Sequence, residues 1–156
     1  MMSSTLVRTA ALVLASAWSV VAVPRPPITH LGSQGPILSG GVATKDLVFV
    51  SGTIPSVNGT IPEGIAAQTR ALKLTYTLQA VVINNIAAIL EEAGTSWEYA
   101  LKTTVYLANM DDFAAMNAVY RELLPNPKPA RTTIQAGRLP GNFLVEIEAV
   151  AAIPQC

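Results

Sequence analysis

The stretch PARTTIQAGRLPGNFLVEIEAVAAIP, residues 129–154, decides how the C-terminal part of this chain folds. Two β-rich runs, residues 131–137 and 143–153, flank a Leu-Pro-Gly-Asn sequence at residues 139–142. Proline followed by glycine between two alternating segments predicts a hairpin or a tight connection between strands. This part of the chain is therefore expected to be sheet, with its turn at the Pro-Gly pair.

The second run carries two carboxylates where a plain core strand would be apolar. Glu146 and Glu148 are two residues apart, so both side chains lie on one face of the strand. The other face is apolar and consists of Val145, Ile147 and Ala149. The pattern predicts a strand with one buried face and one acidic face.

Arg131 opens the first run, and an arginine near a glutamate on a neighbouring strand is either a salt bridge or a site for a small anion. A turn centred on Pro140-Gly141 would place Glu146 opposite Ala136, roughly 16 Å along the strand from Arg131 at about 3.3 Å per residue. That separation excludes a salt bridge within one hairpin. The two side chains converge on one substrate only through another strand arrangement or a neighbouring subunit.

The composition predicts one domain and excludes several classes of protein. Ten basic and ten acidic residues cancel, so the chain lacks the basic excess that is typical of nucleic-acid binding. The 51% hydrophobic content is high for a small domain and favours self-association. One histidine, His30, and one terminal cysteine, Cys156, argue against a His-based triad, an intrachain disulfide and a Cys/His zinc site.

The N-terminal residues 1–23 resemble a targeting segment, because Arg8 precedes an apolar run over residues 10–23. A secretory signal, and hence an extracellular protein without a membrane anchor when mature, is the first interpretation. A mitochondrial presequence or a cytoplasmic location is the alternative. Residues 24–36, rich in proline and glycine, are predicted to be a linker before a domain over residues 37–156.

Within the domain, strands are predicted at residues 47–51 and 102–107. Asp111 or Asp112 is expected to cap a helix, whose buried stripe would consist of Phe113, Met116, Tyr120, Leu123 and Leu124. This order of elements predicts an α+β domain with two helices on one face of a sheet. The other face must also be covered, which again points to self-association.

The first helix is predicted over residues 63–93, with Gly94 as its stop. Inside it the segment LKLTYTL, residues 72–78, alternates like a strand, and a continuous helix from Ile65 to Ala93 would be about 43 Å long at 1.5 Å per residue. A break or bulge is therefore expected within residues 71–82. Upstream, Asn58-Gly59-Thr60 is either a turn or a glycosylation sequon, with turn geometry preferred.

Segments along the whole domain match one known protein family. In chain order they are VFVSGTIP at 48–55, NNIAAILEEAG at 84–94, LKTTVYLANMDDFAAMNAVY at 101–120, PARTTIQAGRLP at 129–140 and LVEIEAVA at 144–151. On these segments the chain resembles the YjgF/YER057c/UK114 family of reactive-intermediate deaminases. The resemblance implies a chorismate-mutase-like mixed sheet and a homotrimer with clefts between subunits. It also implies hydrolysis of 2-imino acids or their enamine tautomers to 2-keto acids and ammonia, without cofactor or metal.

The resemblance assigns roles to particular residues of this chain. Arg131 matches the arginine that binds the substrate carboxylate, and a planar guanidinium suits a two-point grip. Glu146 matches the glutamate that orients or activates the attacking water. The remaining matches line the cleft: Ser51, Gly52, Asn117 and Thr133, the last replacing a cysteine that many relatives have.

Two features depart from the family pattern. Ile37 follows Gly35-Pro36 where relatives usually have a tyrosine, so a hydroxyl is lost from the cleft-lining set. About ten extra residues within residues 71–82 are either a true insertion or a gene-model error. The departure at Ile37 keeps two alternatives open: a non-catalytic trimer that binds small carboxylates, and an enzyme of one biosynthetic pathway acting on a larger reactive intermediate.

Overall fold

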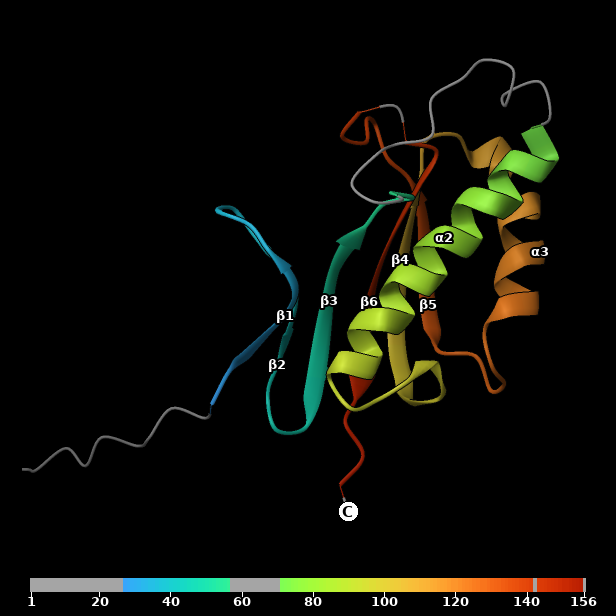
Figure 1. Cartoon of the computed structure of the whole chain (residues 1–156). Helices are drawn as coiled ribbons and strands as arrows, with labels where there is room; N and C mark the ends of the chain where they lie inside the picture. The colour runs from blue at the N-terminus through green and yellow to red at the C-terminus, as the bar shows by residue number, and fades with distance from the viewer. Residues whose placement is uncertain (1–26, 57–70, 142, 156) are drawn as a thin grey trace, which may run out of the picture.

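A computed structural model describes residues 27–56, 71–141 and 143–155 of the chain (Figure 1). The targeting segment, the sequon at Asn58 and the start of the first predicted helix lie outside these residues. The predictions made for those segments therefore stay predictions.

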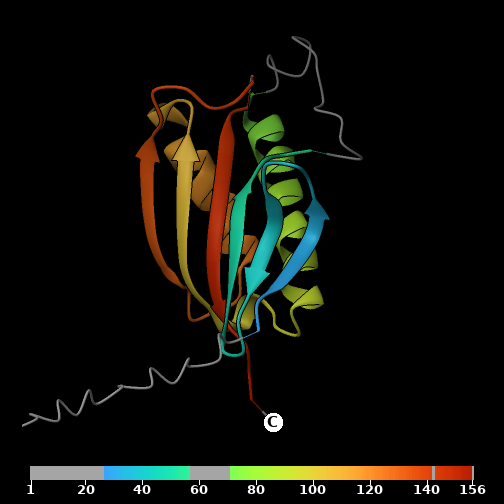
Figure 2. The same ribbon diagram turned by 90° about the vertical axis from the view of Figure 1, so that its left-hand side faces the viewer.

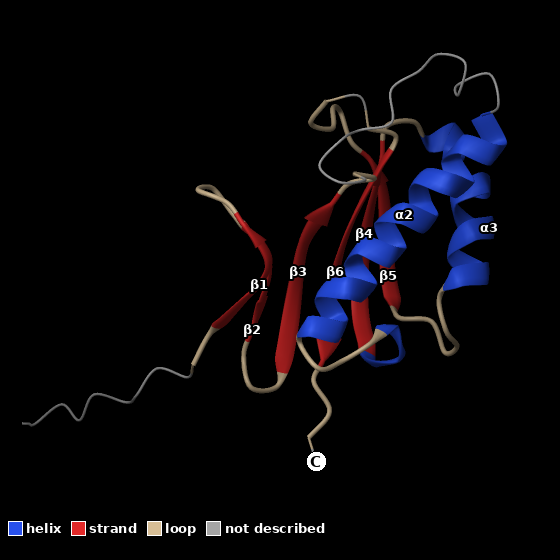
Figure 3. Cartoon of the chain, in the orientation of Figure 1, coloured by secondary structure: helices blue, strands red, loops and turns tan. Residues whose placement is uncertain are grey.

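One mixed sheet of six strands forms the body of the described chain, in the order β1-β2-β3-β6-β4-β5. Neighbouring strands are antiparallel except β4 and β5, which run parallel. Figure 3 separates these strands by colour from the helices and loops. The strands are β1 (Thr29–Gln34), β2 (Ser39–Ala43), β3 (Leu47–Thr53), β4 (Ala100–Leu107), β5 (Ala130–Gln135) and β6 (Val145–Ala152).

Two α-helices, α2 (Ala71–Glu92) and α3 (Phe113–Leu123), cover one face of the sheet. Figure 2 looks onto the other face, which no described helix covers. Two short 3-10 helices, η1 (Trp97–Tyr99) and η2 (Met110–Asp112), precede β4 and α3. The predicted α+β architecture, with two helices on one face, is confirmed.

The expected hairpin between the last two strands is wrong, because β4 lies between β5 and β6. Helix α3 carries the chain from β4 across to β5, and such a crossover makes the two strands parallel. The chain then passes the Leu139-Pro140-Gly141 turn and returns as β6 on the far side of β4. The Pro-Gly turn thus belongs to a connection that skips one strand.

The predicted linker over residues 24–36 is also corrected at its C-terminal end. Residues 29–34 form β1, which pairs with β2 from Thr29↔Ala43 to Gln34↔Ser39. Leu31 is buried in the core below this strand. The folded domain therefore begins before Ile37, because residues 29–34 pair with β2 and Leu31 is buried.

The predicted break within residues 71–82 is absent, since α2 is continuous over 22 residues, about 33 Å at 1.5 Å per residue. The helix thus runs through both the strand-like alternation and the β-branched residues. The buried positions follow helical spacing: Val82, Ile83, Ile86 and Leu90.

Gly94 ends α2 as predicted, with a φ of +75°. Its N–H donates to the carbonyl of Glu91 at 3.0 Å, and the N–H of Thr95 donates to the carbonyl of Leu90 at 2.9 Å. These two bonds form a Schellman motif, which satisfies carbonyls that the helix end leaves free. The left-handed backbone at the cap explains the glycine.

The start of α3 differs from the prediction in its cap. Asp112 occupies the N-cap position but makes no side-chain capping hydrogen bond. Asn109 instead caps η2, where its Oδ1 accepts from the backbone N–H of Asp111 at 3.0 Å. In the predicted stripe Met116, Tyr120 and Leu124 are buried, whereas Phe113 and Leu123 are exposed at its two ends.

Replacing Gly94 with alanine tests the cap. No atom lies within 4 Å of the added Cβ, so the left-handed backbone alone should lower the free energy of unfolding, by about 1 kcal/mol. Denaturant unfolding measures the change. The matched control is Gly137→Ala, where the new methyl also meets open space but the φ is ordinary; equal losses in both variants would contradict the explanation.

Candidate functional site

Arg131 lies on the helix-covered face of the sheet, at the edge strand β5. Its partner in the β4 ladder is Thr103, whose side chain is fully buried. The guanidinium carbon lies 4.7 Å from the centroid of the Tyr120 ring and 5.7 Å from that of Phe113. One Nη1–H donates to the Met116 sulfur at 3.6 Å. Helix α3 thus supplies the surroundings of this arginine.

Among the described residues no carboxylate forms an ion pair with Arg131, so its contacts are aromatic and thioether only. The interpretation of Arg131 as one half of a structural salt bridge is therefore not confirmed. A guanidinium packed on a ring keeps its in-plane N–H groups directed away from the ring. Those are the groups that bind a carboxylate at two points.

Thr133 and Asn117 flank Arg131 on the same side of the molecule. Thr133 follows Arg131 by two residues on β5, so it faces the same way, and its hydroxyl is buried without a hydrogen-bond partner in the described chain. Asn117 is half-buried on α3, one turn from both Phe113 and Tyr120. Arg131, Thr133 and Asn117 are called the arginine group below.

Glu146 points to the opposite face of the sheet. Buried and half-buried residues alternate along β6, with Val145, Ile147 and Ala149 in the core, as the sequence predicted. Glu146 and Glu148 lie on the open face, in register with Tyr106 and Thr104 of β4. Since Arg131 is in register with Thr103, the pleat itself separates the arginine from both glutamates.

Gly52 provides the space in which the Glu146 carboxylate lies. A Cβ built on Gly52 would be 2.0 Å from Oε1 of Glu146, so the carboxylate can occupy this position only beside a glycine. The register of β3 against β6 shifts between Val50 and Thr53, as in a bulge. The preceding Ser51 is half-buried, and its hydroxyl donates to the carbonyl of Ser39 at 2.8 Å. Glu146, Ser51 and Gly52 are called the glutamate group.

The ionisable side chains of the open face influence one another. Partial burial raises the pKa of Glu146, and the charge of Glu148 raises it further. Burial, and then the charge of Glu148 and a hydrogen bond to it, raise the pKa of Tyr106, with a smaller effect from Glu146. A carboxylate with a raised pKa is a better proton acceptor and donor near neutral pH.

Ile37 lies at the turn between β1 and β2, after the end of β1 and before Ser39. Its side chain is 91% exposed, and the turn is closed by the Gly35 N–H, which donates to the carbonyl of Leu38 at 2.9 Å. In Figure 1 the tip of this hairpin stands away from the rest of the sheet. Within one chain Ile37 therefore contributes to neither group.

Three further residues belong to the surroundings of the two groups and were not singled out from the sequence for this role: Thr103, Tyr106 and Tyr120. Thr103 and Tyr106 lie three residues apart on β4, so they face opposite sides of the sheet. Tyr120 was predicted only as part of a core stripe. The available signal in the sequence was a residue with a hydroxyl group, Thr103 or Tyr120, at a position where the alternation or the helical stripe predicts a buried apolar side chain.

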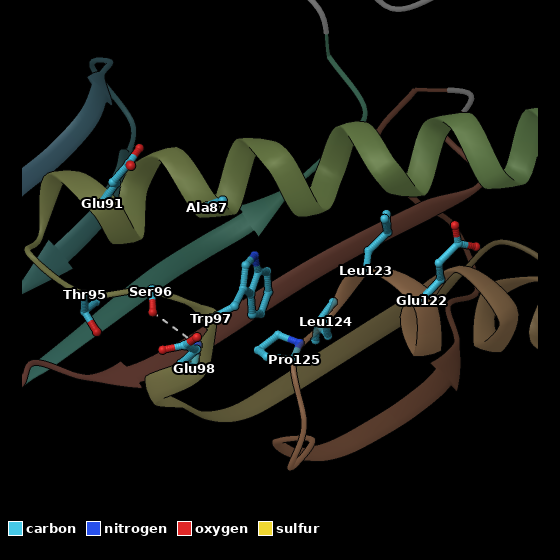
Figure 4. Close-up of a pocket in the computed structure, with 10 residues that line it drawn as sticks. All are labelled: Ala87, Glu91, Thr95, Ser96, Trp97, Glu98, Glu122, Leu123, Leu124 and Pro125. Carbon is cyan, nitrogen blue, oxygen red and sulfur yellow. Dashed lines mark hydrogen bonds between the residues drawn. The ribbon is translucent and has the colours of Figure 1, made fainter.

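A separate groove of about 680 Å³ lies on the outer side of the molecule, between α2, η1 and the end of α3 (Figure 4). Its lining combines Trp97 and Leu123 with the carboxylates of Glu91, Glu98 and Glu122. None of the predicted site residues lines it. The described residues also include no cluster of three or more His, Cys, Asp or Glu side chains that could hold a metal ion.

Comparison with known proteins identifies relatives over most of the chain. A family model described as Endoribonuclease L-PSP matches residues 30–153. The protein mmf2 of Schizosaccharomyces pombe is 41% identical over 128 residues, covering 80% of this chain and 93% of that protein. Reactive Intermediate Deaminase A of Arabidopsis thaliana is 33% identical over 118 residues, covering 74% of this chain and 58% of that protein.

A solved structure agrees with the fold as well. The crystal structure of E. coli TdcF with bound serine superposes with a TM-score of 0.65 at 31% identity, covering 79% of this chain and 92% of that one. The sheet and the two helices described above therefore have the fold of a protein whose structure is known.

The same relatives bear on location. Mmf2 is described as mitochondrial, which is consistent with the mitochondrial alternative for residues 1–23; the secretory interpretation has no support among these relatives. None of the helices that the structure describes is long and apolar enough to cross a bilayer.

Replacing Gly52 with alanine should move the Glu146 carboxylate without unfolding the protein. The atoms that the new methyl meets belong to the end of a flexible side chain, so the loss in unfolding free energy should stay below about 1 kcal/mol. Gly41→Ala is the contrast, because that methyl meets the Phe49 carbonyl at 3.1 Å and Ile89 at 2.9 Å. Denaturant unfolding and a crystal structure of each variant measure both effects.

Glu146→Gln tests the raised pKa through the pH dependence of stability. A carboxyl whose pKa is raised by folding stabilises the protein at pH values below its ordinary pKa, and this contribution is lost as pH rises through the raised value. The variant should therefore gain stability relative to the natural protein over that interval, by less than about 1 kcal/mol because the group is partly solvated. Unfolding at a series of pH values measures it, with Glu98→Gln on η1 as control; a relative loss would contradict the explanation.

Proposed function

The chain belongs to the Endoribonuclease L-PSP (YjgF/RutC/Rid) family, and from this premise we propose that it hydrolyses 2-imino acids and their enamine tautomers to 2-keto acids and ammonia. The name of the Arabidopsis relative supports this reaction. The serine bound to TdcF supports a substrate with an amino-acid-like carboxylate.

The position of Arg131 supports its role as the carboxylate-binding residue. The guanidinium lies beside Phe113 and Tyr120 and has no ion-pair partner in the described chain. Its in-plane N–H groups match the two oxygens of a carboxylate. The unpartnered hydroxyl of Thr133 on the same face is a further group that a bound substrate would satisfy.

The opposite orientation of the two groups is the observation that carries the proposal of a shared site. Arg131 faces the helices, whereas Glu146 faces the open side of the sheet, so one chain alone cannot bring both to a small substrate. We propose a homotrimer in which the arginine group of one subunit meets the glutamate group of the next. The open face, with Phe49, Val150 and Ile134 among its residues, is apolar enough to pack in such an assembly.

In the shared site Arg131 binds the substrate carboxylate, and Glu146 acts as the general base and general acid. Glu146 accepts a proton from water as the oxygen adds to the imine carbon, and it returns this proton to nitrogen to give a carbinolamine. Glu146 then takes the hydroxyl proton of the carbinolamine and passes it to nitrogen, so that the C–N bond breaks and ammonia leaves as the carbonyl forms. Water and imino acid are thus converted to keto acid and ammonia without another reactant. A raised pKa at Glu146 suits both transfers.

A ribonuclease activity, despite the family description, is not proposed, because the formal net charge is zero and the chain has no excess of basic residues.

One observation favours a second candidate function within the same fold. Ile37 is an exposed apolar residue at the hairpin tip, where relatives usually have a tyrosine. An enzyme that acts on a larger, less polar reactive intermediate would use such a residue.

The direct test is turnover of freshly generated 2-iminobutanoate or 2-aminoacrylate by the purified protein. Keto-acid release should accelerate, and Arg131→Ala and Glu146→Gln should each reduce kcat/KM at least about 100-fold. Gly137→Ala should leave it unchanged. Carboxylate binding without any turnover would show a non-catalytic binding protein instead.

Mixing two inactive variants tests whether subunits share the site. Arg131→Ala and Glu146→Gln proteins, unfolded and refolded together in equal amounts, should regain about a quarter of the natural activity. Three quarters of random trimers then contain both variants, and each of these has one intact site in three. A mixture as inactive as its components would show that each site uses Arg131 and Glu146 of one chain.

A further inference from the structure

We propose that Tyr120 is a positioning residue for Arg131, and that the buried hydroxyl pair of Tyr120 and Thr103 fixes the plane of the guanidinium. This inference rests on the proposed role of Arg131 as the carboxylate-binding residue. It concerns three residues from three elements, Thr103 on β4, Tyr120 on α3 and Arg131 on β5, which contact one another in a closed triangle.

The three sides of this triangle are defined by the structure. Thr103 and Arg131 are partners in the parallel ladder of β4 and β5. The Thr103 Oγ1 and Tyr120 Oη form a hydrogen bond of 2.8 Å in the protein interior. The Tyr120 ring lies 4.7 Å from the guanidinium carbon, closer than the Phe113 ring at 5.7 Å. The residue beside the arginine on the sheet thus also holds the ring against which the arginine packs.

The Tyr120 ring is anchored through its hydroxyl in the protein interior. Tyr120 is 5% exposed and Thr103 is fully buried, so neither hydroxyl has water as an alternative partner, and breaking the bond would leave two buried polar groups unsatisfied. Burial also raises the pKa of Tyr120, which keeps the phenol protonated and able to donate. Tyr120 therefore presents its ring to Arg131 at a fixed height and angle.

A fixed ring matters because an arginine side chain is long and flexible. A free guanidinium loses considerable conformational entropy when it binds a carboxylate at two points. Packing on Tyr120 and donation to the Met116 sulfur restrict that freedom before the substrate arrives. The remaining N–H groups stay in the plane beside the ring, where they meet the carboxylate. Such preorganisation strengthens binding without adding a contact to the substrate.

The hydroxyl pair is more than core packing requires. Valine and phenylalanine have nearly the shapes of threonine and tyrosine, and replacing both partners of a buried hydrogen bond is often close to neutral for stability. The polar pair differs from that apolar pair in one respect: it sets the ring at one position instead of allowing it to slide. This difference makes the proposal testable apart from stability.

The test compares Tyr120→Leu, the double variant Thr103→Val/Tyr120→Phe, and Tyr99→Leu, an exposed tyrosine on η1, as the control. For 2-iminobutanoate, KM should rise about tenfold in Tyr120→Leu and about threefold in the double variant, with kcat changed less, because the carboxylate is bound alike before and during the reaction. The double variant should unfold at nearly the natural denaturant concentration. The control should match the natural protein.

Two measurements separate positioning from general damage. In an Arg131→Lys background, Tyr120→Leu should raise KM no further, because lysine has no planar group to stack; equal effects in both backgrounds would overturn the inference. In the free protein, NMR should show a ring-current shift at the Arg131 δ-protons that Tyr120→Leu abolishes. An unchanged shift in that variant would also overturn it.

The NMR shift and the Kd for 2-oxobutanoate need no turnover. If the natural protein binds this keto acid without hydrolysing imines, the proposed reaction fails, yet a weaker Kd and a lost shift in Tyr120→Leu still support positioning. If turnover is present and neither KM nor the shift responds to Tyr120→Leu, the positioning role fails and the proposed reaction stands.

Discussion

The alternation of side chains along a β-strand controls the rest of this structure. In β4 and β6 every second residue enters the core beneath the helices, and the residues between them face the open side. Because β4 lies between β5 and β6, each residue of these two strands faces the same side of the sheet as its partner on β4. Arg131 is aligned with buried Thr103, and Glu146 with Tyr106, so the arginine and the glutamate are directed to opposite faces. The division of the site follows from the pleat.

This division connects the fold with the proposed assembly. A single chain has an arginine packed on aromatic rings on one side and a partly buried carboxylate above Gly52 on the other. Each group is built by contacts within one chain: α3 packs against Arg131, and the β3 bulge accommodates Glu146. A substrate that must contact both has to bind where two copies meet.

Much of the fold was predictable because it depends on local patterns. The alternation in residues 145–149 placed both glutamates on one face, and Gly94 ended α2 with the left-handed backbone that glycine adopts readily. The partners of a strand are not local. The Pro-Gly turn indicated a hairpin, but the α3 crossover made β5 parallel to β4 and excluded β6 from it. Similarly, α2 is continuous where local propensity predicted a break.

The sequence by itself determined the α+β class, through the order of its strand and helix patterns, and the family, through the resemblance of its segments; that resemblance also singled out Arg131 and Glu146 as candidate site residues. Tertiary structure decided what surrounds them. Strand order put the two residues on opposite faces, and the approach of α3 to β4 brought Tyr120 between Thr103 and Arg131. These contacts join residues far apart in sequence, so no local spacing encodes them. The stretch from Pro129 to Pro154 thus contains Arg131 and Glu146, the two parts of the proposed site, on opposite faces of the sheet.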